Sequence, residues 1–163
     1  MVPKTHDSDA NCTESPREES ERFEQLALEE LRRQKLKITK PRIEVIRALG
    51  STNSALSPYA ILNRIVESGG KIDVVSVYRI VQTLERVGLV HHVGLVDGYY
   101  ACRKGDAEAH QAQLFVCERC GCVTEAPAPP LVWTEMQSTA QAIGFKPSMS
   151  RLETLGACAH CCA

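Results

Sequence analysis

Apolar residues three and four positions apart predict four helices in the first half of the chain. Serine, threonine, aspartate or proline marks the start of the last three, most clearly at Ser57-Pro58 and at Asp73, and glycines mark their ends. The expected helices span about 21–37, 39–50, 57–68 and 73–87.

Two short β-rich runs follow the fourth helix. They cover residues 89–96 and 99–103 and flank Asp97-Gly98, a dipeptide typical of a two-residue type I′ hairpin turn. Helices closed by a β-hairpin predict a winged helix-turn-helix, in which the last helix enters the DNA major groove. The outer face of that helix carries Arg79 among other polar residues, with Tyr78 at its boundary.

The second half of the chain predicts a smaller mixed unit. Strands are expected at 113–117, 122–126 and 148–155, around a helix at 131–143 whose inward face would be formed by Val132, Met136, Ala140 and Ile143. The fold class is therefore α+β. The expected division is a disordered tail at 1–19, a winged-helix domain at 20–103, a hinge linker at 104–112 and a small C-terminal domain at 113–163. So small a core needs a metal, a dimer partner or both.

Charge separates the two halves more sharply than the total suggests. The 163 residues sum to −1, yet residues 20–104 hold fourteen Lys and Arg against nine Asp and Glu, between two acidic flanks. This basic segment favours DNA binding over a merely solvated surface. No run approaches about 18 apolar residues, so no membrane span is expected. The amino terminus lacks a secretory signal, which predicts a cytoplasmic protein with reduced or metal-bound thiols.

Six of the eight cysteines lie at or beyond position 117. Cys117-x-x-Cys120 and Cys158-x-x-Cys161 have the spacing of two thiolate pairs that share one tetrahedral Zn²⁺. A redox role is less favoured, because no βαβ unit precedes either pair. Cys162 adjoins Cys161 and leaves the fourth ligand open. Cys122 is interpreted as a buried apolar side chain and Cys12 as an exposed thiol.

A second cluster involves the hairpin. With Asp97-Gly98 as the turn, Val93 faces Cys102, and His91 lies diagonally from Cys102 on the same face, about 7–8 Å away. A metal ion fits between two such side chains, whereas His92 points to the opposite face. His110 in the linker and Glu125 on the strand after the first cysteine pair are further candidates. Spacing alone leaves this site open, because a linker histidine is usually solvated.

The order of these features closely resembles the ferric uptake regulator family, and within it the zinc uptake regulators. The resemblance covers about residues 20–162 and rests on Thr39-Lys-Pro-Arg42, Ser76-Val-Tyr-Arg79, Gly88-Leu-Val-His91 and His110 ahead of Cys117-x-x-Cys120-Gly. It implies a homodimeric, metal-dependent repressor with an N-terminal winged helix and a C-terminal α/β dimerisation domain.

The resemblance also implies roles for individual residues. A structural zinc would be held by Cys117, Cys120, Cys158 and Cys161, and a regulatory zinc by His91, Cys102, His110 and Glu125. DNA would be contacted by Tyr59 and Arg79, with Arg42 and Tyr78 in the wider DNA-facing set. Members that sense iron usually carry several histidines before the first cysteine pair, where this chain has only His110. The soft Cys102 thiolate also favours Zn²⁺ over an iron or peroxide sensor.

The expected function is a zinc-responsive repressor that binds palindromic operators of zinc-uptake genes as a Zn-loaded homodimer, without a small-molecule substrate. An iron- or peroxide-responsive regulator of the same family is the first alternative. A zinc-dependent hydrolase with Glu125 as general base is the second, disfavoured because four protein ligands leave a catalytic zinc no open position. A zinc-ribbon module without DNA binding is the third, and it leaves the basic segment unexplained.

Overall fold

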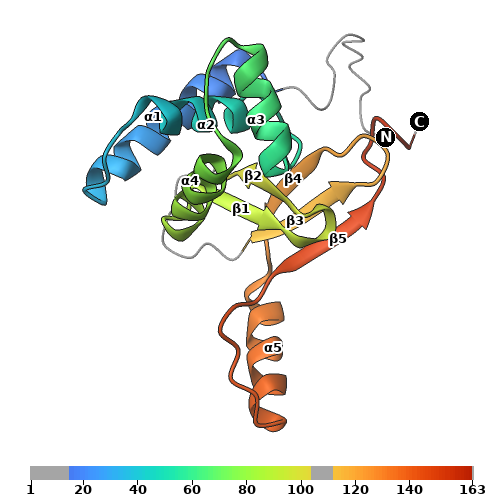
Figure 1. Cartoon of the computed structure of the whole chain (residues 1–163). Coiled ribbons are helices and arrows are strands. Elements are labelled where there is room, and N and C mark those ends of the chain that lie inside the picture. The colour runs from blue at the N-terminus through green and yellow to red at the C-terminus, as the bar shows by residue number, and fades with distance from the viewer. Residues whose placement is uncertain (1–14, 104–111, 163) are drawn as a thin grey trace.

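Four helices form the N-terminal half of the protein, whose computed structural model describes residues 15–103 and 112–162 (Figure 1). They are α1 (Arg17–Arg33), α2 (Lys40–Gly50), α3 (Pro58–Glu67) and α4 (Val74–Arg86). Each helix buries one apolar face in a common core, which explains the spacing of the apolar residues in the sequence.

The first helix begins and ends four residues earlier than expected. Residues 17–19, which we assigned to the tail, belong to its first turn, where Arg17 pairs with Glu21 at 2.8 Å. Acidic residues in this turn also favour a helix start. The helix stops because Lys35, two residues past its end, adopts a left-handed φ of 54°.

The starts of α3 and α4 are capped as expected. The hydroxyl of Ser57 accepts a hydrogen bond from the Ala60 amide at 3.2 Å, and the Asp73 carboxylate accepts one from the Ser76 amide at 2.9 Å. Thr39 has the extended backbone of a cap but no side-chain cap bond.

The hairpin consists of β1 (Val90–Val93) and β2 (Gly98–Ala101), joined by the short 3₁₀ helix η1 (Gly94–Val96). The prediction of a two-residue turn was wrong: His91 pairs with Tyr100, and four residues lie between the strands, of which Asp97 has a left-handed φ of 46°. The pairing of Val93 shifts from Cys102 to Gly98, an even number of positions. His91 and Cys102 therefore stay on one face, as diagonal neighbours.

A three-stranded sheet forms the C-terminal part. It consists of β3 (Ala112–Cys117), β4 (Val123–Pro127) and β5 (Leu152–Gly156), in the order β4-β3-β5. The strands β3 and β4 are antiparallel, whereas β5 runs parallel to β3 after the helix α5 (Pro130–Ala142). Ala112 is thus strand rather than linker, and β5 starts four residues later than expected, because Pro147 and two serines favour a loop there.

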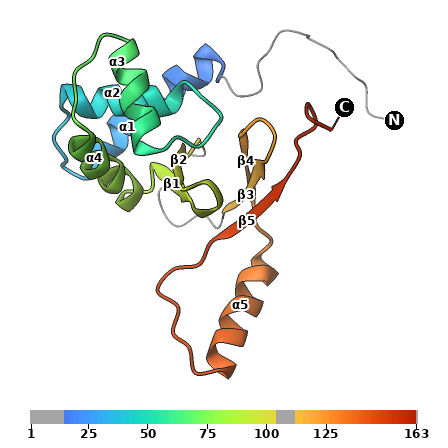
Figure 2. The same cartoon turned by 45° about the vertical axis from the view of Figure 1, so that its right-hand side comes forward.

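The hairpin lies between the helices and this sheet (Figures 1 and 2). Tyr99 and Ala101 belong to the core of the helices. Val93 and Tyr100 belong to a second core, which they share with Leu114, Val116 and Val123 of the sheet. One face of the wing is therefore buried against the four N-terminal helices and the other against the C-terminal sheet.

Helix α5 extends away from the sheet and buries none of its residues in the single chain (Figure 1). The prediction that Met136 and Ile143 face inward was wrong for one chain, since they are 38% and 74% exposed. Phe145 and Met149, in the loop that follows, are exposed as well. An apolar surface of this extent is typical of an interaction site. None of the helices in the described ranges is both long and apolar enough to cross a membrane.

Candidate metal centres and nucleic-acid interface

Three potential metal ligands meet where the wing contacts the C-terminal sheet. His91 comes from β1, Cys102 follows β2 and Glu125 comes from β4, and one ligand atom of each lies within 4.8 Å of the others. The Glu125 side chain is only 4% exposed, and its Oε1 lies 3.7 Å from Nε2 of His91. We call these three residues the hinge cluster. His110, the expected fourth ligand, lies outside the described residues.

The electrostatics of the hinge cluster favour a cation. Burial lowers the pKa of His91, but its contacts with Cys102 and Glu125 outweigh burial and raise the pKa to about 9. The two acidic groups therefore retain a positive charge between them even at the cost of burying it. One nitrogen, one sulfur and one oxygen donor form a set that fits Zn²⁺.

The four cysteines of the two C-x-x-C pairs also meet, at the end of the sheet. Their sulfur atoms lie within 4.8 Å of one another, with Cys120 and Cys158 3.6 Å apart. The first pair is brought together by a tight turn in which Gly121 has a φ of +73°, a conformation that favours glycine. The second pair follows β5, whose parallel pairing with β3 brings it to the first.

Backbone amides prepare this site for thiolates. The Cys120 and Cys158 amides donate hydrogen bonds to the Cys117 sulfur, the latter at 3.3 Å, and lower the pKa of its thiol to about 5. Neighbouring thiols, Cys158 first, raise the pKa of Cys161, as expected where four sulfurs must share one positive centre. Four sulfur donors at these separations fit a tetrahedral zinc.

The remaining described cysteines belong to neither ligand set, although Cys122 lies beside the four-cysteine cluster. Cys162 is exposed, and its thiol bonds the Ala157 carbonyl at 3.3 Å, so the structure places Cys161 in the cluster instead. Cys122 is buried, and burial together with Cys120 and Cys158 raises the pKa of its thiol. This agrees with its interpretation as a neutral apolar side chain. Cys12 lies outside the described residues.

Three of the four expected DNA-contacting residues are open to solvent. Tyr59 is 60% exposed in the first turn of α3, Tyr78 is 40% exposed on α4, and Arg79 beside it is also exposed. Arg42 is only half-buried at the start of α2, and its guanidinium donates to the Lys37 carbonyl. Tyr59, Tyr78 and Arg79 are therefore accessible to solvent, whereas the Arg42 guanidinium is bonded to the backbone of Lys37.

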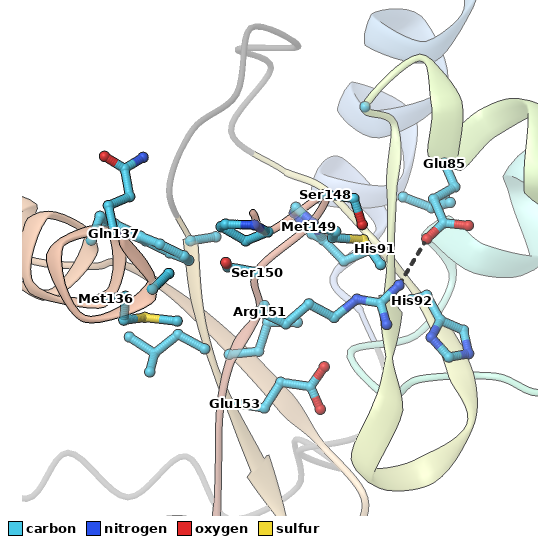
Figure 3. A pocket seen from close by; sticks show the side chains of 18 of the residues that line it. Glu85, His91, His92, Met136, Gln137, Ser148, Met149, Ser150, Arg151 and Glu153 are labelled. Atoms are coloured by element: carbon cyan, nitrogen blue, oxygen red, sulfur yellow. Dashed lines mark hydrogen bonds and ion pairs between the residues drawn. The ribbon is translucent and has the colours of Figure 1, made fainter. Parts of the chain in front are cut away.

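A cleft of about 660 Å³ separates α4 and β1 from α5 and β5 (Figure 3). Across it, Arg151 contacts Glu85 of α4 at 3.3 Å. Glu153 of β5 accepts hydrogen bonds from the amides of Gly94 and Leu95 at the wing tip, both at 2.9 Å. Sequence analysis missed both of these contacts between the C-terminal part and the N-terminal half of the chain.

The sequence of this chain matches a known protein family over most of its length. The sequence profile of the ferric uptake regulator family matches residues 33–155. The chain belongs to this family. Among curated proteins, the zinc uptake regulation protein of Escherichia coli (strain K12) is 32% identical over 126 residues, which cover 77% of this chain and 73% of that protein.

Solved structures of family members share the fold. A zinc uptake regulator complexed with zinc and DNA has a TM-score of 0.80 and 29% identity, covering 88% of this chain and 95% of its own. The holo form of XcZur has a TM-score of 0.75 at 26% identity, covering 86% of this chain and 96% of its own. The apo form of XcZur, also 26% identical, has a TM-score of 0.52, covering 90% of this chain and 99% of its own. At equal identity, the fold of this chain is therefore more similar to the holo form of XcZur than to its apo form.

Proposed function

We propose that this chain is a zinc-responsive transcriptional repressor that binds palindromic operators of zinc-uptake genes as a Zn-loaded homodimer. The observation that carries the proposal is the hinge cluster, in which His91, Cys102 and Glu125 converge at the junction of two structural units.

The hinge cluster draws its residues from both sides of this junction. His91 and Cys102 belong to the wing, which follows α4 directly, whereas Glu125 belongs to the sheet. A bound Zn²⁺ would supply two positive charges that hold donors of both units together. The ligands are complete only when wing and sheet are in contact, so metal binding favours that one arrangement. The expected coupling between zinc and DNA is about 1–3 kcal/mol.

Cys102 supports zinc as the sensed metal. Its buried thiol is the only sulfur donor of the hinge cluster, and thiolates suit Zn²⁺ better than Fe²⁺. The similarity to a zinc uptake regulation protein supports the same choice. We propose His110 as the fourth ligand.

The four-cysteine cluster is proposed to hold a second, structural zinc. Cys117 and Cys120 precede β4, and Cys158 and Cys161 follow β5, so their shared metal would fasten the last strand to the first two. This is a folding role, because the buried core of the sheet is small.

The homodimer is proposed to form through α5 and the loop that follows it. Leu131, Ile143 and Phe145 are each more than 60% exposed there, and a second copy of the chain would cover them. Two symmetric winged helices, each expected to span 20–103, would then read two half-sites of a palindrome. The protein would reside in the cytoplasm, where its cysteine thiols stay reduced.

A catalytic zinc remains the alternative from another class. Glu125 would be its general base, but in this chain it lies 3.7 Å from His91 as a member of the ligand set. An exchangeable water on the hinge metal, detected by relaxation of solvent protons on a Mn²⁺- or Co²⁺-loaded protein, would favour catalysis.

The decisive experiment measures operator affinity with zinc and with a zinc chelator, for the natural protein and for Cys102→Ser. We expect zinc to increase the operator affinity of the natural protein and to leave the operator affinity of Cys102→Ser nearly unchanged. Cys162→Ser, an exposed cysteine outside both clusters, is the matched control and should respond like the natural protein.

Two results would contradict the proposal. A normal zinc response of Cys102→Ser would exclude the hinge cluster as the sensor. A stronger response to Fe²⁺ than to Zn²⁺, measured anaerobically at matched free-metal concentrations, would favour the iron-responsive alternative.

A further inference from the structure

Polar side chains join the wing to the C-terminal sheet at two separate points, in addition to the apolar core that wing and sheet share. The hinge cluster lies at the base of the wing, where His91 is the second residue of β1 and Cys102 directly follows β2. At its tip, Glu153 of β5 accepts hydrogen bonds from two successive backbone amides, Gly94 through Oε1 and Leu95 through Oε2, each at 2.9 Å. The contact at the tip therefore adds a polar fixed point at the far end of the hairpin, beyond the apolar core and the hinge cluster.

The contact at the tip has the geometry of a strong hydrogen-bond pair. A carboxylate that accepts one amide on each oxygen forms two charge-assisted bonds. Glu153 is half-buried, and the tip itself is open to solvent, with Leu95 49% exposed. The Asp97 amide, which closes the tip, donates a long hydrogen bond of 3.4 Å to the Gly94 carbonyl. The Gly94 and Leu95 amides both have the Glu153 carboxylate as acceptor.

Arg151, two residues before Glu153, makes a second contact across the same cleft (Figure 3). Arg151, just before β5, reaches Glu85 of α4 at 3.3 Å. Both partners are about one third exposed, so this ion pair alone contributes little. It nevertheless joins the start of β5 to the helix expected to enter the major groove.

We propose that Glu153 is a positioning residue for metal-dependent DNA binding: its carboxylate holds the wing tip so that the hinge metal and DNA meet the same orientation of the winged helix. Arg151 supports it through α4. The inference rests on the proposed function and extends it, because the contact at the tip involves none of the metal ligands. Glu153 would thus lower the cost of forming the hinge site before zinc arrives.

The first test is independent of DNA. Hydrogen exchange at the Gly94 and Leu95 amides is measured by NMR on the full-length, zinc-loaded protein. We expect the exchange rates of these amides to be at least about tenfold lower than those of unprotected loop amides. Glu153→Gln should abolish this protection. Glu29→Gln removes an exposed carboxylate on α1, a helix outside the proposed dimer surface; it is the charge-matched control and should leave both amides protected.

The second test measures hinge-zinc affinity and operator affinity of the same proteins. Glu153→Gln should weaken both by about five- to tenfold, since both favour the same domain arrangement. Removal of a negative charge by itself strengthens binding to DNA phosphates. A weaker complex is therefore opposite in sign to a general charge effect, which Glu29→Gln reports.

A substitution in the wing breaks the same contact without changing a residue of the sheet, so its effect does not depend on correct folding of a β5 variant. Leu95→Pro removes one of the two amide donors, whereas Leu95→Ala keeps it and serves as its control. Leu95→Pro should weaken operator binding, Leu95→Ala should not, and the double variant Leu95→Pro/Glu153→Gln should lose less than the sum of the single losses. The four-cysteine cluster should still hold one zinc ion per chain in all variants, as measured by native mass spectrometry.

The outcomes separate the two proposals. Unprotected Gly94 and Leu95 amides in the natural protein would overturn the role of Glu153, and so would lost protection in Glu153→Gln with unchanged zinc and operator affinities. Failure of the natural protein to bind operator DNA with zinc would instead overturn the proposed function, while the exchange experiment still reports on the contact.

Discussion

Val93 offers a test of whether the core between the wing and the sheet transmits the zinc signal. Its side chain is fully buried and packs in the core that the hairpin shares with Leu114, Val116 and Val123. Val45 of α2 is equally buried, but in the core of the DNA-binding helices. Val93→Ala and Val45→Ala remove the same two methyl groups from different cores, so they separate a general loss of stability from a loss of coupling.

The expected loss of stability follows from the buried groups. Two methyl groups at about 0.8 kcal/mol each give about 1.6 kcal/mol, and the cavity that remains raises the cost to about 2–3 kcal/mol. Val45→Ala should cost about 0.5 kcal/mol less, because alanine is the better helix former. Urea unfolding of the zinc-loaded protein measures both values.

The expected effect on coupling differs between the two variants. Val93→Ala loosens the contact between wing and sheet, so we expect the ratio of operator affinities with and without zinc to fall by about fivefold. Val45→Ala should leave this ratio within about twofold, because it acts within one unit. Fluorescence anisotropy on labelled operator DNA measures the ratio. An equal change in both variants, or in neither, would refute the idea that this shared core carries the signal.

The remaining predictions concern individual contacts and the metals. Arg33 and Gln34 donate to the buried Glu30 carboxylate, and the Arg33 bond, the largest cause, lowers its pKa; Glu30→Gln should therefore cost about 1 kcal/mol at pH 7, measured by urea unfolding. Because the folded pKa is depressed, this contribution is present above the unfolded pKa and is lost as the pH falls through the folded one, so natural protein and variant should converge in acid. Ser57→Ala removes the cap of α3 and should cost about 1 kcal/mol, seen as a lower Tm. Graded chelation followed by native mass spectrometry should remove one zinc per chain easily and a second only with unfolding of the sheet, whereas Cys158→Ser should lose the resistant zinc.

The helices were predictable because their determinants are local. Apolar spacing and caps such as Ser57 and Asp73 act within a single turn, so the sequence displays them directly. The start of α1 was missed because the Arg17–Glu21 pair stabilises a turn that has no apolar residue. The burial of α5 was misassigned for another reason. Its apolar pattern reveals that a face needs cover, but not whether the same chain or a second copy supplies it.

The hinge cluster was predictable in spite of a wrong hairpin turn. The side-chain period of a strand is two, so an even shift in pairing preserves which residues share a face. His91 and Cys102 thus remain diagonal neighbours, although Leu89 rather than Val93 now bonds the Cys102 backbone, at 3.0 Å. An odd shift would have turned them to opposite faces and removed the site.

Glu153 was not predictable, and the reason is chemical. The chain's eight cysteines and five histidines bind metals through their side chains, so their spacing alone reveals a site. Glu153 binds backbone amides, which almost every residue carries, and no partner side chain distinguishes Gly94 or Leu95 in the sequence. The two attachments of the wing therefore differ in what controls them. The hinge cluster depends on the metal supply and on the identity of its ligands. The contact at the tip depends only on the backbone geometry of the wing and on one carboxylate, so a change in metal concentration does not act on it directly.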